Sequence, residues 1–243
     1  MVDRRKITYI SRALERRFGN PKWEGPSDPL DSLIKTILSQ NTNDRNRDRA
    51  YSQLRERFPT WEEVLAAKTE KIAEAIRVGG LANQKSARIK AILAWLKREY
   101  GQLSLDFIKD MDFDRALETL GPLKGVGVKS LAVVLMFACG QDVFPVDTHV
   151  HRVCRRLGLV PMKATAEKTF HLMRDLVPEG RSFSLHLNMI ALGRQICRPQ
   201  DPKCWQCPIA RYCSFRSLNP NGYRSRSSAR WPGGRQGRSR RGF

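Results

Sequence analysis

Apolar side chains recur along most of this chain at the three- and four-residue spacing of amphipathic helices. Residues 5–18 carry the first such stripe, and residues 29–38 carry a second one that begins after Asp28. No stretch shows the sustained alternation of a strand, and the β-branched run at 131–135 lies within helical spacing. The pattern therefore predicts an all-α protein.

Start and stop signals predict further helices. Residues 60–63, Thr-Trp-Glu-Glu, have the sequence of a capping box at the start of a short helix, and another helix follows at 69–76. A glycine pair ends that run before a longer helix over 82–100, whose apolar face points inward. Its basic side chains are expected to point outward: Lys85, Arg88, Lys90, Lys97 and Arg98. The remaining helices are predicted at 113–120, 128–139, 148–158 and 181–196.

Residues 123–127, Leu-Lys-Gly-Val-Gly, lie between two of these segments and predict a tight helical hairpin. Gly125 and Gly127 permit turn conformations that are closed to other residues, and they allow a backbone phosphate to come close. The amides that open the next helix are unpaired and lie at its positive dipole end, so they can hold a phosphate. A plain helix-capping turn is the alternative.

Lys129 and Asp147 are the candidate reacting groups. Lys129 lies in the first turn of a helix, where the dipole opposes its charge and, with partial desolvation, favours the neutral amine that attacks carbon. Asp147 precedes the helix expected from Thr148, so it is either the N-terminal cap of that helix or a functional carboxylate. An incidental lysine is the corresponding alternative at position 129.

The charge composition indicates that the protein binds a polyanionic partner. The chain has 243 residues, with 44 Lys or Arg against 24 Asp or Glu, which gives a formal net charge of +20. Nucleic acid is the simplest partner for such an excess. Eight arginines and no acid lie in residues 214–243, so +12 of the charge belongs to the rest of the chain. No apolar run reaches membrane-spanning length, and we expect a cytoplasmic, nucleoid-associated protein, or a nuclear one if the source has a nucleus.

Four of the six cysteines are Cys197, Cys204, Cys207 and Cys213, spaced as C-x6-C-x2-C-x5-C. A reducing cytosol disfavours disulfides between them, which leaves a zinc ion or an iron-sulfur cluster, and the spacing alone does not decide. Nearby basic residues are expected to surround the loop or contact phosphate: Lys203, Arg198, Arg211, Arg152 and Arg194. Cys139 and Cys154 lie on apolar helix faces and are predicted to be buried, inert thiols.

The hairpin and the segment Val146-Asp147-Thr148-His149 resemble the endonuclease III family of DNA glycosylases, which carries L-P-G-V-G-x-K followed by V-D-T-H. The resemblance spans residues 5–215, and the family's cysteine pattern, a [4Fe-4S] loop, is identical to the one here. Lys124, Val128 and Ser130-Leu131 depart from the family's residues. The resemblance implies a two-lobed helix-hairpin-helix fold, with Lys129 attacking C1′ of the damaged nucleotide while Asp147 assists.

The same resemblance implies several DNA contacts. The family's L-S-x-Q-x-T-D segment places Asn41 where a glutamine fills the gap left by a flipped base, with Gln40 just before it. Asn41 has a shorter reach, which puts that role in doubt. Leu81 matches a wedge that enters the base stack, although it could instead fold back onto the core. The remaining expected contacts come from the hairpin and the V-D-T-H motif: Gly125, Gly127, Thr148 and His149.

We therefore expect three regions: a six-helix barrel over 24–134, an iron-sulfur domain of 1–23 plus 135–215, and a basic disordered tail over 216–243. The expected function is removal of a damaged base, an oxidised pyrimidine, followed by lyase cleavage, by a monomer acting on double-stranded DNA that holds a damaged base or an abasic site. Three alternatives stay open: an enzyme specialised for abasic sites, a monofunctional mismatch glycosylase, and a noncatalytic DNA-binding module. Monofunctional relatives generally lack a lysine at position 129.

Overall fold

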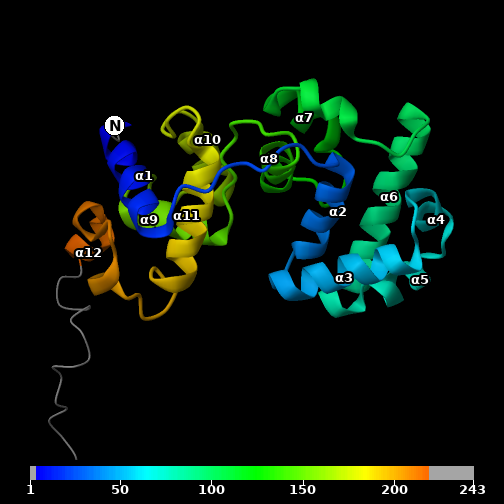
Figure 1. Ribbon diagram of the computed structural model, residues 1–243, viewed down its shortest axis with the longest axis horizontal. Coiled ribbons are helices and arrows are strands. Elements are labelled where there is room, and N and C mark those ends of the chain that lie inside the picture. Colours follow the sequence, from blue (N-terminus) through cyan, green and yellow to red (C-terminus); the bar gives the residue numbers. More distant parts are fainter. Residues whose placement is uncertain (1–3, 219–243) are drawn as a thin grey trace, which may run out of the picture.

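The computed structural model describes residues 4–218, and every regular element among them is helical (Figure 1). The predicted all-α class is confirmed for these residues. The longer helices are α1 (Arg4–Phe18), α2 (Pro29–Ser39), α3 (Asp44–Arg57), α4 (Trp61–Ala66), α5 (Thr69–Ala75), α6 (Ala82–Tyr100), α7 (Phe113–Leu120), α8 (Val128–Phe137), α9 (Thr148–Leu157), α10 (Ala166–Arg174), α11 (Ser182–Gln195) and α12 (Ser214–Leu218). Short 3₁₀ turns lie at Arg77–Gly79, Asp106–Asp110, Cys204–Gln206 and Ala210–Tyr212.

The helices form two groups, with α8 between them (Figure 1). Helices α2 to α7 make one group, and α8 packs against α2 and α7 on that side. Helices α1 and α9 to α12 make the other group, in which α11 packs against both α1 and α9. The chain crosses between the groups after α1, and the indole of Trp23 fixes this crossing by donating to the carbonyl of Phe137 at 2.8 Å.

Side-chain caps explain why most helices begin where the sequence predicts. Asp28 accepts from the amide of Leu30 at 2.7 Å at the start of α2. Thr60 and Glu63 form the predicted reciprocal capping box of α4. Asn43 caps α3 by accepting from the amide of Asn46 at 2.9 Å, so the turn after α2 does lead directly into the next helix.

The helix prediction needs three larger corrections, while several other helix ends differ by one residue. Helix α10 was not expected, although Thr165 caps its first turn. Helix α8 ends at Phe137, two residues before the expected end. Helix α12 includes residues 216–218, which we had placed in the basic tail, while residues 219–243 of that tail lie outside the described part of the chain. Among the described residues, no helix is both long and apolar enough to cross a membrane.

Lys85 is the clearest error of the sequence prediction, because it points inward. Its side chain is fully buried, and the ammonium donates to the carbonyls of Leu38 and Gly79, each at 2.8 Å. The carbonyls at the end of a helix have no intrahelical partner, and Lys85 satisfies one such group of α2. A basic residue on the presumed outer face of α6 thus joins α2 to the loop before α6.

The two remaining cysteines differ in their burial. Cys154 is fully buried, and burial raises the pKa of its thiol to about 12. Cys139 is only half-buried, which corrects the prediction, and desolvation raises its pKa to about 11. Both thiols are therefore protonated at neutral pH, as expected of inert cysteines.

Candidate active site

The hairpin between α7 and α8 has the predicted tight turn. The amide of Val126 donates to the carbonyl of Leu123 at 3.0 Å, and the Val126 side chain is buried. Gly125 has a φ of +95°, a conformation that L side chains rarely adopt. The requirement for glycine at this position is therefore conformational, as predicted.

Gly127 does not have a backbone conformation that requires glycine. Its backbone is extended, with φ −108° and ψ 179°, so other residues could adopt it, which corrects the conformational part of our prediction. A Cβ added there would meet no atom within 4 Å. Gly127 begins α8 without a side-chain cap, so no capping side chain of that residue satisfies the first amides of this helix, which can donate to an anion.

Lys129 is the second residue of α8 and is half-buried. Burial is the main cause that lowers the pKa of its amine, the Asp147 carboxylate acts in the opposite direction, and the Arg47 guanidinium lowers it further. Among the described residues, only burial and the charges of Asp147 and Arg47 shift the pKa of the Lys129 amine, and no hydrogen bond contributes. A lysine whose pKa is lowered by burial reaches its neutral, nucleophilic form at a lower pH than an exposed lysine.

Asp147 caps α9, as the simpler interpretation predicted. One carboxylate oxygen accepts from the amide of Val150 at 2.7 Å. The charge of the same carboxylate raises the pKa of Lys129, against the effect of burial. A carboxylate has two oxygens, so the cap leaves acceptor capacity for a second role.

His186 of α11 supports the segment before Asp147, and the sequence did not mark it out from the other histidines. It is buried, and its Nδ1 donates to the carbonyl of Pro145 at 2.9 Å. Burial lowers its pKa to about 4, so the imidazole is neutral at physiological pH. Its position on the apolar face of a predicted helix was the available signal.

Asn41 and Leu81 share an unusual backbone. Both are exposed, and both lie in the left-handed region, with φ of 54° and 50°. Leu81 is 45% exposed and so does not fold back onto the core. Such a conformation at a non-glycine residue carries strain, and here it presents both side chains to solvent from tight turns.

Gln40 does not face solvent with its amide. Its Nε2 donates to the carbonyl of Gly125 at 3.0 Å, and its Oε1 accepts from Arg88 Nη1 at 2.8 Å. Both polar atoms are therefore engaged within the protein. The sequence did not predict this link to the hairpin, because it depends on how α2, α6 and α7 pack.

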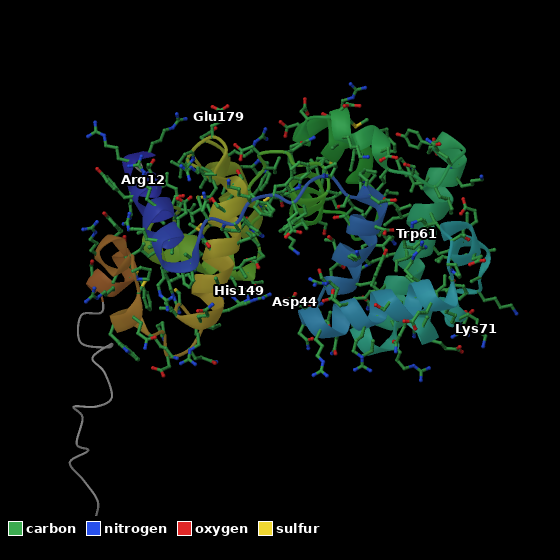
Figure 2. The ribbon with its side chains drawn as sticks, viewed as in Figure 1. Arg12, Asp44, Trp61, Lys71, His149 and Glu179 are labelled. Atoms are coloured by element: carbon green, nitrogen blue, oxygen red, sulfur yellow. The ribbon has the colours of Figure 1, made fainter. Side chains whose placement is uncertain are left out.

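The V-D-T-H segment lies on the facing side of the other helix group. Thr148 is exposed, and His149 Nδ1 accepts from Arg152 Nη2 at 3.0 Å. Burial, with smaller contributions from Arg152 and Arg194, lowers the pKa of His149. Figure 2 shows His149 and Asp44 on the facing sides of the two helix groups.

The four clustered cysteines line one cavity, so the fold brings them to the same part of the molecule. Its other walls include the apolar side chains of Val153, Leu192, Ile196 and Ile209. Burial, with a contribution from the other cysteines, raises the pKa of Cys204 and raises that of Cys207 to about 12. No group of three or more His, Cys, Asp or Glu within residues 4–218 is arranged to hold a metal ion. The donor set nevertheless fits a thiolate-ligated cation, which would offset the cost of ionising these thiols.

Arginines of α9 hold this loop. Arg152 donates to the carbonyl of Cys197 at 2.9 Å, so it contacts the cysteine loop. Arg156, one turn later, lies 3.4 Å from the Cys197 sulfur and donates to the carbonyl of Arg198 at 2.7 Å. Sequence reasoning missed Arg156, although its i, i+4 spacing from Arg152 was the available signal. Arg194 instead pairs with Asp44.

Comparison with known proteins gives the family. Residues 34–179 match the model of the HhH-GPD superfamily of base excision DNA repair proteins. A protein of Arabidopsis thaliana provisionally named a DNA glycosylase is 40% identical over 168 residues, which cover 69% of this chain and 57% of that protein. Endonuclease III of Thermotoga maritima is 35% identical over 209 residues, which cover 86% of this chain and 92% of that enzyme.

Solved structures agree. A non-covalent complex of endonuclease III with DNA gives a TM-score of 0.77 at 27% identity and covers 90% of this chain and 98% of that one. A thermostable thymine-DNA glycosylase, at 23% identity and a TM-score of 0.74, shares the fold. The chain therefore belongs to the HhH-GPD superfamily of base excision DNA repair proteins, among its endonuclease III-like DNA glycosylases.

Proposed function

We propose that this glycosylase removes an oxidised pyrimidine from double-stranded DNA and then cuts the strand through a covalent imine on Lys129. The observation that carries the proposal is the Lys129 amine, whose neutral form burial favours, at the uncapped start of α8 and within the field of Asp147. An enzyme that only activated water would have no use for a desolvated lysine there.

The proposed reaction starts with the neutral amine of Lys129. Its lone pair forms a bond to C1′ while the bond from C1′ to the base breaks, and the base leaves with that electron pair and takes up a proton. The Asp147 carboxylate stabilises the positive charge that develops on the sugar. The bonded nitrogen then loses one proton, the bond from C1′ to the ring oxygen breaks as that oxygen takes up a proton, and a protonated imine remains at C1′. Loss of a C2′ proton then expels the 3′ phosphate, and water hydrolyses the imine to free Lys129.

DNA contacts are proposed for each exposed element of the site. The open amides after Gly127, with the backbone of Gly125, would hold a backbone phosphate. Asn41 and Leu81 would occupy the stack left by the extruded nucleotide. Thr148 and His149 would contact the same strand from the second helix group.

We propose that Cys197, Cys204, Cys207 and Cys213 hold a [4Fe-4S] cluster. Their shared cavity and their soft sulfur donors support this, while zinc is the other cation that accepts four thiolates. The cluster would stabilise the loop between α11 and α12. Arg156, which lies beside Cys197, would counter the negative charge of the thiolate ligands.

The domain division proposed from the sequence, 24–134 against 1–23 plus 135–215, is supported by the two helix groups of Figure 1. A monomer is the proposed active form. Strand cleavage without efficient base removal, at abasic sites, is the second candidate function. It is favoured by Asn41, which has a shorter reach than glutamine, and by Gln40, whose amide is already engaged.

Borohydride trapping tests the proposal. Wild-type protein should become covalently attached to duplex DNA that holds an oxidised pyrimidine, and Lys129→Gln should bind the same duplex without attachment. Trapping on an abasic site alone would favour the second candidate function. Release of a base without any trapping would contradict the lysine mechanism, and failure to act on any damaged duplex would favour a noncatalytic DNA-binding module.

A further inference from the structure

Gln40 lies where three elements meet. Its amide nitrogen donates to the carbonyl of Gly125 in the hairpin at 3.0 Å. Its amide oxygen accepts from Nη1 of Arg88, on α6, at 2.8 Å. One half-buried side chain therefore connects the turn after α2, the hairpin before α8 and the first turns of α6.

The chemistry of the two partners fixes the orientation of the Gln40 amide. A backbone carbonyl can only accept, and a guanidinium can only donate, so the NH2 group must face Gly125 and the oxygen must face Arg88. A glutamate at this position would keep the Arg88 contact and place an oxygen against the carbonyl of Gly125. The arrangement is thus specific for glutamine.

Arg88 also contacts the hairpin directly. A Cβ built on Gly125 would lie 2.9 Å from Cδ of Arg88, so the stem of Arg88 occupies the space that a side chain at Gly125 would need. The hairpin and α6 therefore approach each other at a glycine. Any side chain at this position would push them apart.

The same helix is fastened to α2 a second time. Lys85, one turn before Arg88, donates to the carbonyl of Leu38, two residues before Gln40, and to that of Gly79, two residues before Leu81. The side chains of Lys85 and Arg88 thus join α6 to the segments that carry Asn41 and Leu81.

We propose that Gln40 and Arg88 are positioning residues that set the hairpin at a fixed distance from Asn41 and Leu81 before DNA arrives. This inference rests on the proposed function, because it assumes that the hairpin holds phosphate while Asn41 and Leu81 enter the base stack. DNA with an extruded nucleotide then meets a hairpin, an Asn41 turn and a Leu81 turn that are already correctly placed. Little binding free energy is therefore lost in ordering them. Undamaged DNA, which uses the phosphate contacts without the insertion, gains little from this arrangement.

The test compares Gln40→Ala, Gln40→Glu, Arg88→Ala and the double variant Gln40→Ala/Arg88→Ala with wild type. Arg98→Ala is the matched control, because it removes one arginine from α6 that pairs only with its neighbour Glu99 among the described residues. The probes are a duplex with a tetrahydrofuran abasic analogue, which cannot be cleaved, and the same duplex without the lesion. Affinity is measured over a range of salt concentrations.

We call the Gln40–Arg88 pair the brace. Each single substitution in it should weaken binding to the abasic duplex about tenfold. Affinity for undamaged DNA should stay within about twofold of wild type, and the dependence of affinity on salt should not change. The double variant should lose no more than the worse single variant, because the pair acts as a unit. Arg98→Ala should leave the ratio of the two affinities unchanged.

Three outcomes would overturn the proposal. Equal weakening on both duplexes, with a salt slope lower by about one in Arg88→Ala, would make Arg88 a simple phosphate contact. Additive losses, or a Gln40→Glu variant that binds like wild type, would overturn it too.

Amide hydrogen exchange in the free protein separates this inference from the proposed function. In Gln40→Ala the amides of residues 123–129 should exchange at least several-fold faster, whereas those of α11 should not change. If wild type does not prefer the abasic duplex, the proposed function fails. Faster exchange at residues 123–129 in Gln40→Ala would still show that Gln40 holds the hairpin in place. Unchanged exchange at 123–129 would overturn the brace even if the enzyme is active.

Discussion

Arg194 at the end of α11 pairs with Asp44, the first residue of α3, with Nη1 and Oδ2 2.9 Å apart. The pair joins the two helix groups of Figure 1 beside the proposed active site. Arg47 Nη1 contacts the other oxygen of Asp44 at 3.0 Å, so one carboxylate holds an arginine from each group. Arg47 in turn lowers the pKa of Lys129.

Loss of this interlobe pair should have little effect on stability. Both side chains are about half-exposed, and exposed ion pairs contribute less than about 1 kcal/mol. Arg194→Ala should therefore lower the free energy of unfolding by less than that amount in urea titrations. A loss of several kcal/mol would mean that Arg194 stabilises the protein through something other than the exposed pair.

The rate of imine formation should rise with pH. The neutral amine of Lys129 reacts, and its pKa lies below the usual 10.5 because of burial and Arg47, so the reactive fraction increases as pH approaches that lowered pKa. Arg47→Ala should raise the pKa and move the profile to higher pH. Single-turnover cleavage of a preformed abasic site measures this. Arg57→Ala, on the same helix but paired with Glu74, is the control whose profile should match wild type.

The two hairpin glycines should respond differently to alanine. Gly125→Ala should destabilise the protein by about 1 kcal/mol or more, because φ is positive and Arg88 occupies the space. Gly127→Ala should change the free energy of unfolding by less than about 0.5 kcal/mol, since the backbone at Gly127 is extended and an added Cβ would meet no atom. Its methyl group would project toward the proposed phosphate position, so DNA affinity should fall. Gly127→Ala with normal affinity would place the phosphate elsewhere.

Lys85→Met should be among the most destabilising substitutions outside the apolar core. It leaves the carbonyls of Leu38 and Gly79 buried without a donor, which costs about 2–4 kcal/mol for the two groups. Chemical denaturation measures the loss. Lys97→Met removes a more exposed lysine from the same helix and should cost far less; similar losses for the two variants would show that the buried bonds contribute little.

Purified protein should contain iron and absorb visible light if the four clustered cysteines hold the proposed cluster. Cys207→Ser should abolish that absorption and lower thermal stability, whereas Cys139→Ser, outside the cluster, should keep both. Zinc in place of iron, in fully active protein, would contradict the iron-sulfur assignment.

Most helix boundaries could be predicted because their signals are local. Asp28, Asn43 and Thr60 cap helices by bonding amides two or three residues ahead, so sequence spacing contains the information. The inward turn of Lys85 and the engagement of Gln40 could not be predicted in this way. Each depends on a carbonyl brought close by packing between distant segments, and hydrophobic periodicity does not record which polar groups such packing leaves unpaired.

The same distinction between local signals and long-range packing separates the site residues that the sequence indicated from those that it did not. Lys129 and Asp147 could be singled out as candidates because both lie at helix starts, which the sequence marks. Arg156 and His186 were missed because they bond carbonyls more than forty residues away, at Arg198 and Pro145. The reason for Gly127 was only half predicted, since an extended glycine and a left-handed one look alike in the sequence.

The packing of α1 against α11 determines when this protein can finish folding during its synthesis. Helix α1 leaves the ribosome long before α11, and until then its buried face of Ile7, Ile10 and Leu14 lacks its main helical partner. Helices α2 to α7 contact mainly one another and can assemble earlier as the chain emerges. Helix α1 is therefore made before α2 to α7 but covered after them, and substitutions that make its apolar face more hydrophobic should reduce the yield of soluble protein more than they reduce the stability of the folded enzyme.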